Sequence, residues 1–416
     1  MRKIKIKNFG PIKEGYQDGD GFMEVKKATV FIGNQGSGKS CVAKLISTLS
    51  WMEKAMVRGD FKTQDLTVYN RFRKHCSYQN IGNYFIDSTS PIHGTVIEYQ
   101  GKAYNISYKN GETLVEKNAE NGYSFPKIMY VPAERNFVSA VKNVIKLKGL
   151  PNTLYTFTEE DNKAKEDLNS PLELPINKAK FEYRKPSGVS WIVGDGYEVR
   201  LSEASSGFQS SVPLFLVTRY LALSINKEKD GSVKEISIEE ERRIRKEIEK
   251  ILSNPNLTED VKKASLEFLS AKFKYSCFIN IVEEPEQNLF PTSQQNLLNS
   301  LLSFNNMNEG NMLVITTHSP YIINYLTLAI KAFFLLGLIK TTDKIDELNT
   351  KLKEIVPLES TVNPEELAIY ELDDKGNIIK LGNYKGLPSD ENYLNDRLSE
   401  TNDLFSQLLD IEDLCQ

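Results

Sequence analysis

The chain has 416 residues, of which 40% are hydrophobic and 26% are charged, and its formal net charge is −4. This length and composition can bury a sizeable core, so we expect one large domain or two closely joined domains. The slightly negative charge argues against a protein that coats nucleic acid over its whole surface. The four cysteines are widely spaced, which predicts neither a disulfide framework nor a zinc site.

A strand is expected directly after Met1, which leaves no room for a secretory signal peptide and favours a cytoplasmic protein. The most apolar stretch, 321–339, carries Asn324 and Lys331, so we expect a buried helix and no membrane span. Lysines recur in the first forty residues. On edge strands they would protect against strand pairing, and a DNA-binding surface is the sharper alternative.

The first motif lies between an apolar strand at 28–32 and a helical pattern that begins at Cys41. Its sequence, GNQGSGKS, matches the phosphate-binding P-loop pattern, in which glycines let backbone N–H groups point at phosphate oxygens. Lys39 is expected to bridge the terminal phosphates of ATP, and the Ser40 hydroxyl is expected to bind Mg²⁺. The predicted nucleotide-binding residues are Gly33, Asn34, Gln35, Gly36, Ser37, Gly38, Lys39 and Ser40.

Two segments of mixed pattern follow. Residues 84–131 alternate short strands with turns, which predicts an antiparallel β subdomain beside the P-loop. Residues 132–200 predict a helix, a polar loop near 159–170, and a hairpin that ends after the turn at 194–196.

A short polar motif opens the next helix. The segment 204–209 reads Ala-Ser-Ser-Gly-Phe-Gln and is followed by a strongly apolar run at 212–217. A Ser-Ser-Gly turn before a helix is an anion-binding N-terminus, although an ordinary helix cap has the same pattern. The candidate residues are Ser205, Ser206, Gly207 and Gln209. Residues 226–272 are charged and predict a short helical hairpin that is broken at 254–256.

Two apolar strands then end in chemically distinctive residues. The run 277–282 is typical of a buried parallel strand and ends in Glu283 and Glu284. Ligands bind at this end of such strands, which places Glu283 beside Mg²⁺ and Glu284 where it can accept a proton from the attacking water. The strand 312–316 leads to His318, in the segment Thr-His-Ser-Pro.

The last residues hold a helix, a strand pair around the turn 373–377, and an amphipathic tail helix with Leu404, Leu408, Leu409 and Leu414. Residues 359–416 contain 14 acidic and four basic side chains. We therefore expect this region to repel phosphate and to contact a basic partner. The predicted division is an ATPase lobe at 1–225, a helical hairpin at 226–272, a second part of the ATPase core at 273–345, and a C-terminal region at 346–416.

These motifs, in this order, resemble the P-loop, signature, Walker B and switch-histidine segments of the ABC ATPase superfamily. The opening 4–12, the segment 130–135 and the run 204–214 resemble the SMC-like, OLD-type ATPases of prokaryotic defence systems, among them the PARIS anti-phage type. The resemblance implies an α/β fold: a P-loop NTPase of ABC-ATPase head type with an antiparallel β subdomain and a helical insertion. It also implies that His318 contacts the γ-phosphate and that segment 286–291 lies against a partner subunit. The family usually has Asp where this chain has Glu283.

The resemblance further implies that the signature of one copy completes the ATP site of another, in a head-to-tail dimer or a larger homo-oligomer. It implies an ATPase that acts as a sensor or regulatory subunit, holding or releasing a separate effector such as a TOPRIM-type nuclease in response to a phage-encoded trigger. Two C-terminal strands are too few for a TOPRIM sheet, so any effector is expected on another polypeptide. The alternative is an SMC-like ATPase for DNA repair or DNA-end binding, for which DNA would be the partner.

Overall fold

In the computed structural model, the described residues are 1–68, 70–87, 94–109, 111–119, 122–141, 144–229, 238–254, 258, 261–263, 265–266, 269 and 274–414. The main sheet has the strand order β2-β16-β15-β4-β14-β13-β8, and β15, β4, β14, β13 and β8 run parallel. Its strands are β2 Gly15–Tyr16, β4 Ala28–Gly33, β8 Pro126–Val131, β13 Cys277–Glu283, β14 Met312–Thr317, β15 Leu367–Leu372 and β16 Asn377–Lys380.

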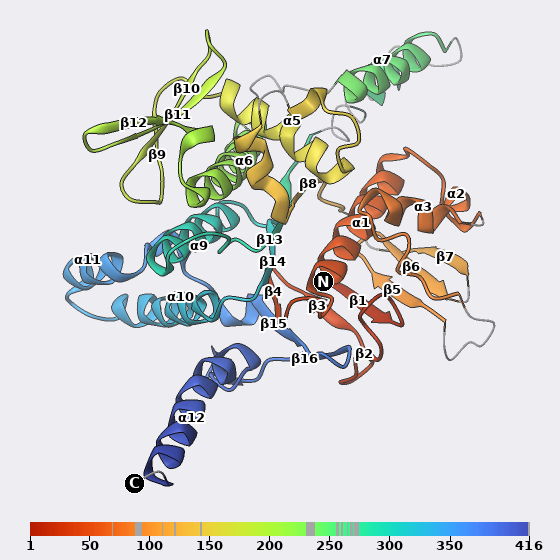
Figure 1. Cartoon of the computed structure of the whole chain (residues 1–416). Coiled ribbons are helices and arrows are strands. Elements are labelled where there is room, and N and C mark those ends of the chain that lie inside the picture. The colour runs from red at the N-terminus through yellow and green to blue at the C-terminus, as the bar shows by residue number, and fades with distance from the viewer. Residues whose placement is uncertain are drawn as a thin grey trace.

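Both faces of this sheet are covered (Figure 1), which explains why β4, β13 and β14 are buried at every position. Alternate side chains enter two different cores, as the period of a strand requires. Val30 and Ile32 pack with α5 (Asn152–Glu166), α6 (Ser206–Lys229), α9 (Pro291–Asn306) and α10 (Pro320–Ile339). Phe31 packs on the opposite face, with α1 (Lys39–Arg58) and the second sheet.

The second sheet is antiparallel and confirms the β subdomain predicted after the P-loop helix. Its strands are β3 Met23–Val25, β1 Arg2–Lys7, β5 Val96–Gln100, β6 Tyr104–Lys109 and β7 Glu112–Lys117, in that spatial order. Two expectations are wrong here. The last part of 84–131 is β8, which leaves the subdomain and pairs in parallel with β13. The lysine-bearing β1 is not an edge strand, because it pairs with both β3 and β5.

The segment before the signature forms a third sheet, with the order β12-β11-β10-β9. The turn predicted at 194–196 joins β11 to β12 as expected. The polar loop expected near 159–170 is wrong, because α5 continues to Glu166. This helix buries Phe157, Glu160 and Asp161, so the polar residues lie on a helix that packs into the core. The strands are β9 Leu172–Glu173, β10 Lys180–Arg184, β11 Val189–Gly194 and β12 Tyr197–Arg200.

The insertion after α6 contains α7 (Ile238–Leu252), and much of the part of the predicted hairpin after the break at 254–256 lies outside the described residues. The remaining helices and short strands are α2 Thr63–Thr67, α3 Arg71–Tyr78, α4 Phe137–Ala140, α11 Ile345–Ile355, β17 Asn383–Tyr384, β18 Leu387–Pro388 and α12 Tyr393–Leu414.

The C-terminal strand pair belongs to the main sheet, since β15 pairs in parallel with the P-loop strand β4. Asp373 fixes the turn as expected, because its carboxylate accepts hydrogen bonds from the Lys375 and Asn377 N–H groups at 2.9 and 2.7 Å. The tail helix α12 is attached only near its start, where Leu394 is buried, and then extends away from the body (Figure 1).

Helix α10 differs from its expected burial. Ile322, Leu326 and Ile330 are buried, whereas Phe333, Phe334 and Leu338, in the last turns of the helix, are 37–63% exposed. By length and composition alone, α10 is the one helix of the described residues that is long and apolar enough to cross a membrane, with a mean hydropathy of 2.0. In its most apolar 18-residue stretch, 39% of the residues are buried, and the helix packs against α9 and α11.

Candidate nucleotide-binding site

The P-loop lies where β4 ends and α1 begins, as its sequence predicted. Gly33 has φ 142°, and a Cβ atom there would lie 2.3 Å from the Leu372 carbonyl oxygen of β15. Gly38 caps α1 with φ 105°, and a Cβ atom there would lie 3.0 Å from the Ile12 side chain. Glycine is therefore required at both ends of the loop, by its backbone conformation and by close packing.

Lys39 is buried in the centre of this loop. Its Nζ donates hydrogen bonds to the carbonyl oxygens of Gly33 and Asn34, at 2.8 and 2.7 Å. Burial lowers the pKa of the Lys39 amino group, and the nearby Glu284 and Glu286 carboxylates partly oppose that shift. A buried cation where a glycine-rich turn meets a helix N-terminus is the arrangement that a P-loop offers to phosphate.

Strand register brings the other predicted residues to the same edge. In the parallel pairing, Thr317 of β14 is opposite Ile32 of β4, and Thr316 is opposite Glu283 of β13. The P-loop, the paired threonines and the Walker B carboxylate therefore follow one another along the carboxyl ends of three adjacent strands. This is the edge of an open α/β sheet at which ligands bind.

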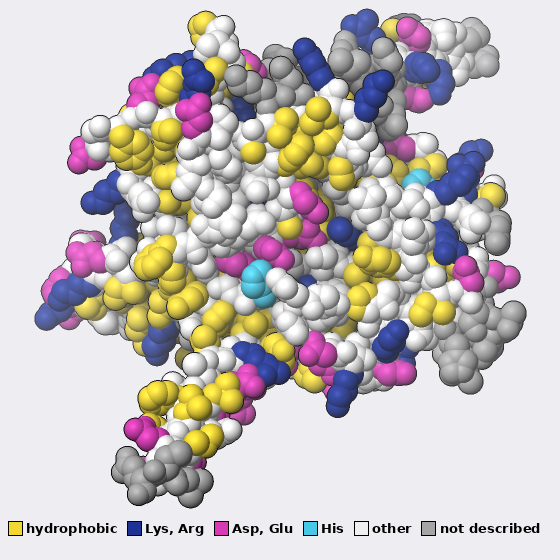
Figure 2. All heavy atoms as spheres, viewed as in Figure 1, with side chains coloured by type: hydrophobic (Ala, Val, Ile, Leu, Met, Phe, Trp, Pro, Cys, Tyr) yellow, Lys and Arg dark blue, Asp and Glu magenta, His cyan; other side chains and the backbone are white. Residues whose placement is uncertain are grey.

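Three carboxylates and His318 surround this edge. Glu283 is buried and accepts a hydrogen bond from the Ala133 N–H at 3.1 Å. Glu284 has φ 44°, which turns its partly exposed side chain out of the strand direction. His318 Nδ1 lies 3.5 Å from Glu286 Oε1 and 3.8 Å from Glu284 Oε1. Figure 2 shows acidic side chains gathered around a histidine near the middle of this face.

Sequence reasoning missed the structural role of Glu286. Its Oε1 accepts hydrogen bonds from the Thr317 hydroxyl at 2.7 Å and from the His318 N–H at 2.9 Å. Glu286 therefore holds the backbone that carries His318. The Glu-Glu-Pro-Glu sequence was the available signal, but only the fold shows which carboxylate faces β14.

Several polar atoms at this edge are buried and have no hydrogen-bond partner within the described part of the chain. They are Ser37 Oγ, Glu283 Oε1, Glu286 Oε2, Thr316 Oγ1 and His318 Nδ1. Buried polar atoms are normally paired, so an unpaired group of this size at one edge fits a site built for a polar ligand.

The described residues contain no group of three or more His, Cys, Asp or Glu side chains that could hold a metal ion by itself. This still fits Mg²⁺, which in nucleotide sites uses one or two protein oxygens together with phosphate oxygens and water. Glu283 Oε1, at the end of β13, and the half-buried Ser40, in the first turn of α1, are the side chains that would hold it.

The signature residues Ser205 and Ser206 are exposed at the start of α6. Gly207 packs against the segment after Walker B, and a Cβ atom there would lie 2.8 Å from the Asn288 carbonyl oxygen. The side-chain amide of Gln209 donates to the Ser202 and Ala204 carbonyl oxygens of its own chain. Among the described residues, no hydrogen bond joins Ser205 or Ser206 to the P-loop.

Arg135 connects the two halves of this region and was singled out in the sequence only as part of a resemblance. Its guanidinium is fully buried and donates to the carbonyl oxygens of Glu283 and Glu284, both at 2.6 Å, and of Ser210 at 3.0 Å. Burial lowers its pKa to about 10, so it stays charged at neutral pH. One side chain therefore joins the Walker B backbone to the first turns of the signature helix.

The strand order, the register and the loop geometry define an α/β P-loop NTPase fold with an antiparallel β subdomain. No protein-family model and no curated protein matches the chain. Among solved structures, the SMC head domain from Thermotoga maritima has 12% identity and a TM-score of 0.34, over 78% of this chain and 90% of that one. An SMC head bound to the C-terminal winged-helix domain of ScpA has 10% identity and a TM-score of 0.37, over 92% and 98%.

A dimeric ATP-binding cassette bound to ADP and Pi has 11% identity and a TM-score of 0.29, over 92% of this chain and 100% of that one. At such identities and TM-scores these likenesses carry no functional inference. The fold class stands on the strand order, the register and the loop geometry described above.

The first prediction concerns Arg135→Lys. A lysine ammonium lacks the planar fork that reaches four carbonyl oxygens at once, so we expect Glu284 to lose its fixed position. We expect nucleotide turnover to fall about 10²-fold while the KM for nucleotide changes much less. The control is Arg397→Lys, on the exposed part of α12. Steady-state kinetics on folded protein, checked by thermal unfolding, measures the difference; an equal rise in KM would contradict a positioning role.

Proposed function

We propose that this protein binds and hydrolyses ATP with Mg²⁺, at a site that a second copy of the chain completes. The observation that carries the proposal is the placement of Lys39, Glu283, Glu284 and His318 around one sheet edge, together with buried polar atoms that lack partners there. These are the groups that phosphoryl transfer to water requires: a phosphate cradle, a cation, a metal ligand and a base.

Each residue has a distinct task in this proposal. Lys39 exchanges its two carbonyl contacts for the terminal phosphates and stabilises the charge that develops on them. Glu284, which is partly exposed, orients the attacking water and accepts its proton. His318 contacts the terminal phosphate, from a backbone position that Glu286 holds. Mg²⁺, when bound by Ser40 and Glu283, supplies charge neutralisation between the phosphates.

The position of the signature supports completion of the site by a partner. Ser205 and Ser206 open a 24-residue helix whose N-terminus carries partial positive charge, and both residues are exposed. Phe290 lies directly before α9, two residues after Asn288, which packs against the signature residue Gly207. It is a large apolar side chain, and it is 73% exposed. Exposed anion-binding and apolar groups on adjacent segments suit a head-to-tail contact with a second P-loop.

The second prediction tests the base. Glu284→Gln keeps the shape of the side chain but cannot accept a proton, so ATP hydrolysis should fall at least about 100-fold while ATP still binds. The matched control is Glu359→Gln, outside the site. Single-turnover hydrolysis and ATP binding, measured on the same preparation, separate the two steps. An unchanged hydrolysis rate would show that another residue activates the water.

The third prediction tests the composite site. Lys39→Ala and Ser205→Arg each remove one half of every site in a homodimer, so each variant alone should be inactive. Mixed dimers contain one intact P-loop facing one intact signature, and mixing should therefore restore part of the ATPase activity. The measurement is turnover against mixing ratio, with native mass spectrometry to show that mixed dimers form. Inactivity of proven mixed dimers would exclude completion in trans.

We also propose the finer role of a sensor or regulatory subunit in a defence complex, which controls a separate effector. The free part of α12 supports a partner-binding role. Its apolar side chains are 45–61% exposed: Leu398, Leu404, Phe405, Leu408, Leu409 and Ile411. The same region is strongly acidic, which favours a basic protein partner over DNA, the alternative ligand. The described body of this chain leaves these apolar side chains uncovered.

The fourth prediction concerns this helix. The Tyr393 N–H is held by Glu371 and Leu394 is buried, so a truncation should begin after them. Deleting 396–416 should leave ATP turnover within about twofold, since exposed residues contribute little to stability. The same deletion should abolish co-purification with the effector. The first candidate effector is the product of the neighbouring gene. Leu404→Ser with Leu408→Ser should do the same, and Asp403→Ser should not. If the truncated protein still co-purified with the effector, α12 would not be the partner-binding surface.

A further inference from the structure

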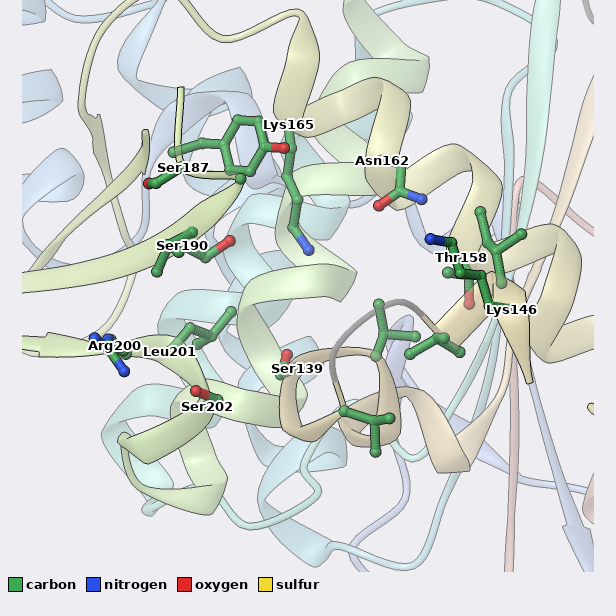
Figure 3. Close-up of a pocket in the computed structure, with 17 residues that line it drawn as sticks. Ser139, Lys146, Thr158, Asn162, Lys165, Ser187, Ser190, Arg200, Leu201 and Ser202 are labelled. Atoms are coloured by element: carbon green, nitrogen blue, oxygen red, sulfur yellow. The ribbon is translucent and has the colours of Figure 1, made fainter. Parts of the chain in front are cut away.

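A cavity of about 620 Å³ lies beside the signature segment, and its described lining includes no residue of the P-loop, of β13 or of the segment around His318. It is open to solvent on one side and is bordered by the segments 138–141 and 144–146, by α5, by the hairpin β10–β11 and by the turn Leu201–Glu203. Figure 3 shows side chains from all these segments around one space. Its volume is in the range of sites that hold small molecules.

The charge of the lining favours an anion. Lys146, Lys165 and Arg200 line the cavity, and the described lining contains no Asp or Glu, although Glu203, next to the lining, pairs with Arg200 at 3.4 Å. Lys165 is 8% exposed, and its amino group points into the space between Ser190 and Asn162 (Figure 3). Its partner, Asp161, is fully buried on the same helix and fixes the lysine in place.

The remaining lining is of two kinds. Hydroxyl groups come from Ser139, Thr158, Ser190 and Ser202, and the amide of Asn162 joins them. Apolar side chains come from Val144, Ile145 and Val189, among others. A cavity with cations, hydroxyls and an apolar wall matches a ligand that has a phosphate, a sugar-like polar part and a flat apolar part.

The cavity wall is joined directly to the signature segment. Ser139 donates a hydrogen bond from its hydroxyl to the Gln209 carbonyl oxygen at 2.8 Å. The Gln209 side chain in turn donates to the Ser202 carbonyl oxygen at 3.1 Å. Ser139 and Ser202 are thus both hydrogen-bonded to Gln209, which follows Ser205 and Ser206. A ligand that contacts both Ser139 and Ser202 could therefore shift the position of this loop.

We propose that this cavity binds a nucleoside monophosphate, and that its occupation adjusts the signature loop. Lys146, Lys165 and Arg200 bind the phosphate, and the apolar wall receives the base. The site is separate from the P-loop, so binding to the cavity stands without the proposed ATPase. The effect on turnover, in contrast, rests on the proposed function.

The experiment titrates AMP, GMP, CMP and UMP into the Lys39→Ala protein, in which the P-loop has lost its central cation, and follows binding by calorimetry. At least one of the four is expected to bind with one site per chain. Lys146→Glu and the cavity-filling Ser190→Phe should each weaken that binding at least about 10-fold, whereas Lys148→Glu, outside the lining, should not. No binding by any of the four, or binding that survives both cavity variants, overturns the site.

A second measurement tests the link to the signature. In the wild-type protein, the bound monophosphate should change ATP turnover at least about twofold, and Lys146→Glu should remove that response without changing basal turnover. Binding without a change in turnover overturns the regulatory part alone. Absence of ATP turnover in every sample, with monophosphate binding intact, would instead count against the proposed ATPase.

Discussion

The structure around the site depends on one buried cation that binds only backbone oxygens. Arg135 donates to carbonyl groups at the end of the Walker B strand and in the signature helix, segments that are far apart in the sequence. A buried guanidinium without such partners would be costly, so these segments are stable only when they meet. The same contact holds Glu284 in its unusual backbone conformation, with φ 44°. It therefore gives a physical route by which movement of the signature helix reaches the proposed base.

The C-terminal strands complete the site rather than follow it. β15 lies beside the P-loop strand, and its Leu372 carbonyl is the atom that excludes a side chain at Gly33. Glu371 of the same strand accepts a hydrogen bond from the Tyr393 N–H, at the start of α12. The exposed tail helix is thus attached to the strand that borders the phosphate-binding loop. Strand β15 therefore links the P-loop to the start of α12, whose free part is the proposed partner surface.

The region before the signature shares the core on one face of the main sheet and borders a cavity. α5 and the sheet of β9 to β12 pack on α6, and the Asp161–Lys165 pair is buried between them. Desolvation raises the pKa of the Asp161 carboxyl, and the nearby Lys165 opposes that shift. A buried ion pair adds little net stability, and at the cavity wall it fixes the position of the Lys165 amino group. The signature loop is bordered on one side by this cavity and on the other by the segment after Walker B.

The sequence by itself determined the P-loop, the buried parallel strands and the carboxylate and histidine that end them. These features are local: glycine spacing, apolar runs and strand ends follow from backbone sterics and burial within a few residues. Only the tertiary structure decided that β8 joins the main sheet, that β1 lies inside its sheet, and that 159–166 is helical. The tertiary structure also showed the roles of Arg135 and Glu286, because the hydrogen-bond partners that define those roles lie more than thirty residues away in the sequence. Such contacts depend on which strands become neighbours, and a single sequence carries no local pattern for that choice.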